Sequence, residues 1–166
     1  MTKFTTVLGS LLSHLSRSVF GKAVQKYHAD KGVRTLSTYD FFKMMIYGLL
    51  SGCFSVRDIE ISMRANGSRL YHAGLPQLKR STFCDAMEKR DYHVFEDVFH
   101  AAVDKAQLLA GRTKKLFKNP LRIIDASVIS LCLATYDWAF YRKAKGAVKL
   151  HLNLDGDNLM PYDAYL

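Results

Sequence analysis

Residues 121–125 read Leu-Arg-Ile-Ile-Asp, a short apolar run that ends in one carboxylate. The run opens a longer stretch, residues 121–133, whose branched side chains favour β-structure on both sides of a polar break that begins at Asp125. We therefore expect one strand at 121–125 and another at 128–133. A carboxylate placed where a buried strand meets solvent is well suited to hold a metal ion. Asp125 is accordingly a candidate catalytic and metal-binding residue.

Two further strand-like segments follow this stretch. Residues 145–154 alternate between apolar and polar side chains over their later part. Residues 155–158, Asp-Gly-Asp-Asn, have the composition of a tight hairpin turn, and residues 159–166 are expected to pair back as the next strand. The C-terminal part is thus predicted to be a small antiparallel sheet.

The chain before this sheet is predicted to be helical. Apolar side chains recur at helical spacing, and serines at the starts of several segments are suitable N-caps. We expect a hairpin of helices at 7–15 and 19–27, a central apolar helix at 37–51, and further helices at 55–64, 69–72, 79–90 and 92–110. Pro120 closes a basic connector and marks a boundary. The predicted fold class is α+β, with a helical domain at residues 1–118 and a sheet domain at 119–166.

Composition indicates a globular protein with a polyanionic partner. The 166 residues are 49% hydrophobic and carry a formal net charge of +9, which favours nucleic acid because basic side chains release counterions from phosphates. A merely soluble basic domain is the alternative. No signal peptide or membrane span is predicted, so a cytoplasmic location is expected. The three cysteines lack metal-binding spacing and are expected to be reduced core thiols.

The helix predicted at 79–90 is the first candidate DNA-binding element. Hydroxyls, cations and free N–H groups at a helix start suit phosphate contact, and a helix in the major groove can read bases. The separation from the helix at 55–64 exceeds the short turn of a helix-turn-helix motif, and a charged, solvated face remains the alternative. The candidate residues are Lys79, Arg80, Ser81, Thr82 and Lys89.

The connector after residue 110 is the second candidate. Its cations surround Phe117, and cations interleaved with an aromatic ring suit a segment that follows a nucleic-acid backbone. An exposed linker kept in solution by its charge is an equal alternative. The candidate residues are Arg112, Lys114, Lys115 and Lys118.

Asp125 needs partners if it is to serve in phosphoryl transfer. Such enzymes commonly hold two metal ions about 4 Å apart between several carboxylates, which one aspartate cannot supply. Ser127, His151, Asp155 and Asp157 are candidate neighbours. However, Asp155 and Asp157 fit a hairpin turn better than a ligand pair, and His151 is better interpreted as a strand residue.

Several motifs occur in an order that resembles bacterial insertion-sequence transposases of the insertion sequence 4 family. The similarity spans the whole chain, and two of its elements, Asp-Ala-Ser and Lys-Gly-Ala-Val-Lys-Leu-His, are fairly specific in combination. The motifs are Lys79-Arg80-Ser81-Thr82-Phe83, Lys118-Asn119-Pro120-Leu121, Ile124-Asp125-Ala126-Ser127-Val128-Ile129, Trp138-Ala139 and Lys145-Gly146-Ala147-Val148-Lys149-Leu150-His151.

The resemblance implies a ribonuclease-H-like enzyme in which two aspartates and a glutamate coordinate two Mg²⁺ ions. These ions activate water and then a DNA 3′-hydroxyl, so that the element's terminal repeats are cleaved and joined to a target. Asp125 matches the first aspartate, and Ser127 matches a hydroxyl position two residues later. Arg80, Ser81 and Thr82 match the basic helix of the family's N-terminal domain.

The second aspartate and the glutamate of the family have no counterparts in this chain. The resemblance therefore implies the first three strands of an incomplete catalytic fold, with weak or absent Mg²⁺ binding and no strand transfer by the chain alone. An unpaired sheet edge predicts self-association or association with a full-length transposase. The alternatives are an inactive or inhibitory DNA-binding protein and, third, a stand-alone metal nuclease.

Overall fold

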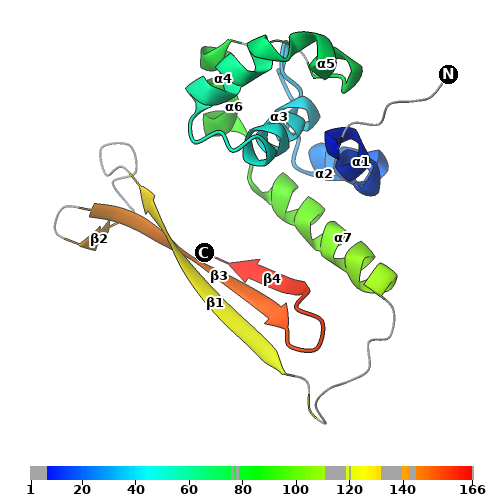
Figure 1. Ribbon diagram of the computed structural model, residues 1–166, viewed down its shortest axis with the longest axis vertical. Helices are drawn as coiled ribbons and strands as arrows, with labels where there is room; N and C mark the ends of the chain where they lie inside the picture. Colours follow the sequence, from blue (N-terminus) through cyan, green and yellow to red (C-terminus); the bar gives the residue numbers. More distant parts are fainter. Residues whose placement is uncertain are drawn as a thin grey trace. The chain divides into compact units, whose positions relative to one another are not determined.

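The computed structural model describes residues 7–75, 77, 79–110, 119, 121–131, 140–142 and 145–165. Helices occupy the N-terminal part and strands the C-terminal part, so the α+β fold class is confirmed (Figure 1). The elements are α1 (Val7–His14), α2 (Arg17–Lys26), α3 (Thr38–Leu50), α4 (Val56–Ala65), α5 (Gly67–His72), α6 (Arg80–Lys89), α7 (His93–Ala110), β1 (Arg122–Leu131), β2 (Phe140–Arg142), β3 (Lys145–Asp155) and β4 (Pro161–Tyr165).

The chain divides into two compact units, Met1–Phe99 and His100–Leu166. This division falls inside α7, whereas the sequence places the domain boundary after residue 118. The basic connector at 111–118 lies outside the described residues, so the predicted boundary itself stays a prediction.

Helix α3 is the centre of the helical unit, as its apolar sequence predicts. Ser37 caps its first turn by accepting a hydrogen bond from the Asp40 backbone N–H at 3.1 Å. Gly52, with a φ of +65°, follows the helix end in a conformation that favours glycine. Met44 on this helix is completely buried.

Two clusters of buried side chains surround α3. The larger joins α3 to α1, α4, α5 and α6 and consists of Leu8, Leu12, Leu36, Phe41, Met44, Tyr47, Met63, Leu70, Leu75, Phe83 and Ala86. The smaller joins α2 to the start of α7 and consists of Phe20, Ala23, Val94 and Val98. Phe42 on α3 packs against both clusters. The helical unit therefore folds around one helix that has apolar neighbours on several sides.

The sheet is antiparallel and centred on β3. Strand β1 pairs with β3 along its whole length, from Arg122 opposite Asp155 to Leu131 opposite Gly146. The short β2 and the strand β4 both pair with β3 as well, at opposite ends of it. Because a strand has only two hydrogen-bonding edges, β2 and β4 share the edge opposite β1.

Two details of the sheet differ from the sequence prediction. The predicted break at residues 125–127 does not occur, because Asp125 pairs with Leu152 and Ser127 with Leu150 in an uninterrupted ladder. Strand β1 is also not buried: Ile124 is 62% exposed, and every side chain described from residue 121 to 129 is exposed. Polar residues are readily accommodated in a strand whose side chains meet water.

Two further sequence expectations concern the membrane and the cysteines. No helix in the described part of the chain is both long and apolar enough to cross a membrane. Cys53 is half-buried and Cys84 is exposed on α6, and both are free thiols. The expectation of core thiols is therefore wrong for Cys84, because the helix turns this position away from its buried face at Phe83 and Ala86.

Candidate functional site

Helix α6 carries the basic residues that the sequence singles out. Phe83 and Ala86 are buried and fix the helix against the core. Lys79, Arg80 and Ser81 are exposed at its start. No acidic side chain lies in the first turn and no side chain caps it, so its N–H groups and its partial positive charge face an exposed, basic surface.

The candidate residues of α6 point in different directions. Thr82 and Lys89 lie seven residues apart on one side of the helix, together with Asp85 between them. Arg80 precedes Lys89 by about two and a half turns and therefore lies on the opposite side. There it lines a small pocket with Glu60 of α4. The structure thus brings Thr82 and Lys89 together and separates them from Arg80.

Thr82 and Lys89 line an open groove of about 340 Å³ between α6 and the loop that joins α2 to α3. Four basic side chains and two carboxylates line this groove, in addition to His28. The basic residues are Lys31, Arg34, Lys89 and Arg90, and the acidic residues are Asp85 and Asp91. We refer to it as the α6 groove. Of its cations, the sequence predicts only Lys89 as a candidate DNA-binding residue. Lys31 and Arg34 lie in a loop with no recognisable motif.

The loop of the α6 groove is fixed by partly buried hydrogen bonds. The backbone N–H and the hydroxyl of Thr38 both donate to one oxygen of the Asp30 carboxylate, each at 2.7 Å. Arg90 donates from Nη2 to the carbonyl of Leu36 at 2.6 Å, and Leu36 is itself buried. The Nε of Arg90 is buried without a hydrogen-bond partner in the described part of the chain. These contacts hold Lys31 and Arg34 on an ordered loop.

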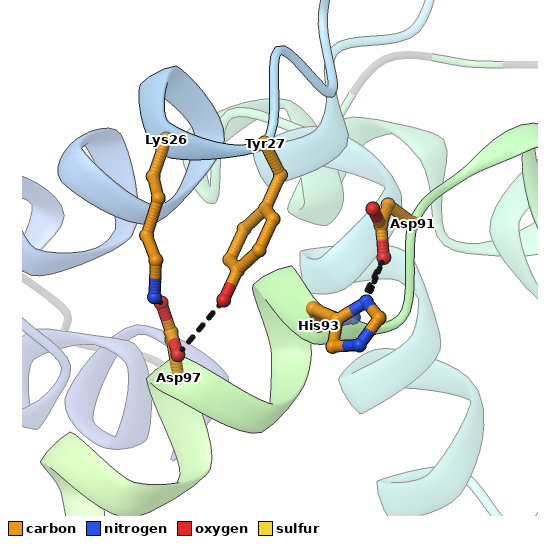
Figure 2. Close-up of polar contacts among 5 residues, drawn as sticks. All are labelled: Lys26, Tyr27, Asp91, His93 and Asp97. Atoms are coloured by element: carbon orange, nitrogen blue, oxygen red, sulfur yellow. Dashed lines mark hydrogen bonds and ion pairs between the residues drawn. The ribbon is translucent and has the colours of Figure 1, made fainter.

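Polar contacts also join α2 to the start of α7 beside the groove (Figure 2). Lys26 forms an ion pair with Asp97 at 2.8 Å, and the Tyr27 hydroxyl donates to the same carboxylate at 3.3 Å. The pKa of Lys26 is raised, chiefly by its hydrogen bond to Asp97. The pKa of Asp91 is lowered, chiefly by the ring N–H of His93, which lies 2.6 Å from the carboxylate.

Asp125 lies in the middle of β1 rather than at a strand end, and its side chain is exposed. Its cross-strand partner is Leu152, and Ser127 faces the same side of the sheet two residues later. His151 pairs with Ala126 and therefore faces the opposite side, as does Asp155. Of the four predicted neighbours, only Ser127 shares a face with Asp125.

The remaining predicted neighbour, Asp157, lies in the hairpin turn. Its backbone N–H donates to Asp155 Oδ1 at 2.8 Å, and the N–H of Gly156 donates to the carbonyl of Leu121 at the same distance. The prediction of a turn at residues 155–158 is confirmed. No group of three metal-ligating side chains occurs within the described ranges. Asp125 is therefore not grouped with two further metal-ligating side chains in the part of the chain that the structure describes, and its role as a magnesium ligand stays a prediction.

Several candidate residues cannot be placed. Arg112, Lys114, Lys115 and Lys118 lie outside the described residues, as do Trp138 and Ala139 of the transposase resemblance. Their roles stay predictions from sequence.

A family model matches the N-terminal part of the chain. Residues 3–76 match the family described as Domain of unknown function (DUF4372), an N-terminal domain found in transposase-like proteins. The matched segment covers α1 to α5 and the loop of the α6 groove. No curated protein and no solved structure matches the chain.

Proposed function

We propose that this chain is the N-terminal portion of a bacterial insertion-sequence transposase, and that its helical unit binds the double-stranded DNA of the transposon ends. The observation that carries the proposal is the basic surface of α6, where Lys79, Arg80 and Ser81 surround an uncapped helix start. Phosphate oxygens accept hydrogen bonds from such groups. The net charge of +9 and the match of residues 3–76 support the same function. Such a protein would act in the bacterial cytoplasm.

The sheet supports a second part of this proposal. Strands β1, β3 and β4 lie side by side in antiparallel pairs, which is the arrangement that the transposase resemblance implies for the first strands of a ribonuclease-H-like domain. We propose Asp125 as the first metal carboxylate of that domain. Mg²⁺ is commonly bound through one or two carboxylates with further oxygens from phosphates, so an exposed aspartate is a suitable ligand.

The DNA-binding part can be tested by fluorescence anisotropy with a labelled duplex of about two helical turns, or about 20 base pairs. We expect binding by the whole chain, with an affinity that falls steeply as the salt concentration rises. The double variant Lys79→Ala with Arg80→Ala should bind more weakly. Absence of binding by the unmodified chain at low salt would rule out the proposed function.

The catalytic part needs a different assay, because a non-enzymatic DNA-binding protein is the competing function. One observation favours this competitor. Among the described residues, Asp125 is the single candidate metal carboxylate on its face of the sheet, and phosphoryl transfer needs several. With supercoiled plasmid and Mg²⁺ we expect no nicking by this chain alone. In a longer transposase chain that supplies the other carboxylates, Asp125→Ala should abolish cleavage, and cleavage that survives this change would refute the assignment.

A further inference from the structure

We infer that the α6 groove holds the phosphate backbone of duplex DNA and that the loop residues Lys31 and Arg34 make this contact, independently of base sequence. The inference rests on the proposed function and extends it. The groove is a second DNA-contacting surface, on the side of α6 opposite Arg80. Its contacts with phosphates position the protein on DNA without reading bases.

The charge of the groove is the first argument. The side chains of Lys31, Arg34 and Lys89 are exposed and form no hydrogen bond or ion pair with any residue in the described ranges. Elsewhere on the helical unit, the cations Lys26 and Arg64 are paired with carboxylates. Unpaired cations that converge on one concave surface keep their donors available for an anion.

The two carboxylates of the groove do not cancel this charge. Asp91 accepts hydrogen bonds from both the ring and the backbone N–H of His93, at 2.6 and 3.0 Å. Asp85 is exposed on α6 between Thr82 and Lys89, and it is the one lining carboxylate that forms no such bond within the described residues. The basic side chains therefore exceed the acidic ones, and the groove retains a net positive charge.

The length of the groove favours a polymer over a small anion. Thr82 and Lys89 are seven residues apart along α6, a rise of about 10 Å. The phosphate backbone of a DNA strand winds around the duplex axis and presents one phosphate per nucleotide, so a groove of this length can contact more than one phosphate in succession. A hydroxyl at one end and an ammonium at the other are both common phosphate donors, with Lys31 and Arg34 across the groove.

The order of the loop is the third argument. Asp30, Thr38, Arg90 and Leu36 hold the loop through the hydrogen bonds described above, and Gly32 adopts a φ of +76° at its turn. A cation on a preordered loop loses less conformational entropy on binding than one on a chain that must first fold. The loop is thus already shaped to present both cations.

The test compares two double variants with the same change in net charge. Lys31→Ala with Arg34→Ala removes the loop cations of the groove. The control, Lys22→Ala with Arg57→Ala, removes two cations that are also exposed, lie on α2 and α4, and are not part of the groove. Each protein is titrated with two labelled duplexes, one with a transposon-end sequence and one with a random sequence, over a series of salt concentrations.

We expect the groove variant to weaken binding to both duplexes by the same factor, roughly tenfold. The slope of log affinity against log salt should decrease by about 1.8, which corresponds to two lost phosphate contacts. The control should retain most of the affinity and slope. Lys89→Ala, which changes the helix side of the groove, should lower the slope by about 0.9.

The outcomes separate the two proposals. If the unmodified chain binds DNA but the groove variant and Lys89→Ala behave like the control, the inference is wrong and the proposed function stands. If the groove variant loses affinity for only one duplex, the contact reads bases and the inference is also wrong. If the unmodified chain binds neither duplex at low salt, both proposals fall together. Circular dichroism of each variant checks that its helices remain folded.

Discussion

The partly buried hydrogen bond between Thr38 and Asp30 allows a quantitative test of how the loop of the α6 groove is held. The hydroxyl of Thr38 is completely buried and donates to Asp30 Oδ1 at 2.7 Å. Thr38→Val removes this donor, preserves the shape of the side chain and keeps the backbone N–H that donates to the same oxygen. The variant therefore removes one hydrogen bond to a charged acceptor and little else.

The expected loss is about 1.5 kcal/mol in the free energy of unfolding. Hydrogen bonds to charged groups contribute about 1.5–3 kcal/mol. The lower end applies here because Asp30 is only half-buried, so water can replace part of the interaction. Urea unfolding followed by far-ultraviolet circular dichroism reports on the helical unit, and the midpoint should fall without a change in slope.

A double-mutant cycle with Asp30→Ala isolates the interaction. In the Asp30→Ala background the hydroxyl has lost its charged acceptor and keeps only the Ala29 carbonyl, at 3.5 Å, so Thr38→Val should then cost less than about 0.5 kcal/mol. An equal cost in both backgrounds would show that the Thr38 hydroxyl does not stabilise the protein through Asp30, and the account of the fixed loop would be refuted.

Two further predictions concern the helical unit. Gly21 lies inside α2, and a Cβ added there meets no atom within 4 Å. Gly21→Ala should therefore raise the free energy of unfolding by about 0.5–1 kcal/mol, measured by thermal or urea unfolding. A loss of stability would contradict the described helix. The pKa of Asp91 is lowered by His93, so this pair adds stability above the ordinary aspartate pKa, and that stability is lost as the pH falls through the lowered value. Asp91→Asn should therefore flatten the acid side of the stability–pH profile, and an unchanged profile would argue against the pair.

Much of the helical unit can be predicted from sequence because its local signals agree with its packing. Ser37 and Ser55 are N-caps in the structure, as their positions before apolar segments predict. Gly52 ends the central helix as expected. In each case the residue satisfies a backbone requirement that depends only on its near neighbours, and such requirements are visible in a single sequence.

The candidate site is less predictable because it depends on contacts between distant segments. Lys31 and Arg34 become candidate DNA-binding residues only because their loop lies beside α6, which follows more than 40 residues later in the chain. The direction of Arg80, away from Lys89, follows from helical geometry but was not anticipated from the cluster of charges.

The sheet shows the same limit of prediction from sequence. The hairpin turn at residues 155–158 is a local signal and was predicted correctly. The continuity of β1 through Asp125 was not, since a polar residue between apolar runs resembles a break until the partner strand is known. The register with β3 alone decides that His151 and Asp155 face away from Asp125.

Amide hydrogen exchange of the whole chain, with and without a saturating DNA duplex, tests the central claim most directly. We predict that bound DNA slows exchange in the loop at residues 28–36 and in α6, and that raising the salt concentration removes this protection together with binding. Protection that is confined to other segments while DNA is bound, or DNA binding that leaves the loop and α6 unchanged, would contradict the account.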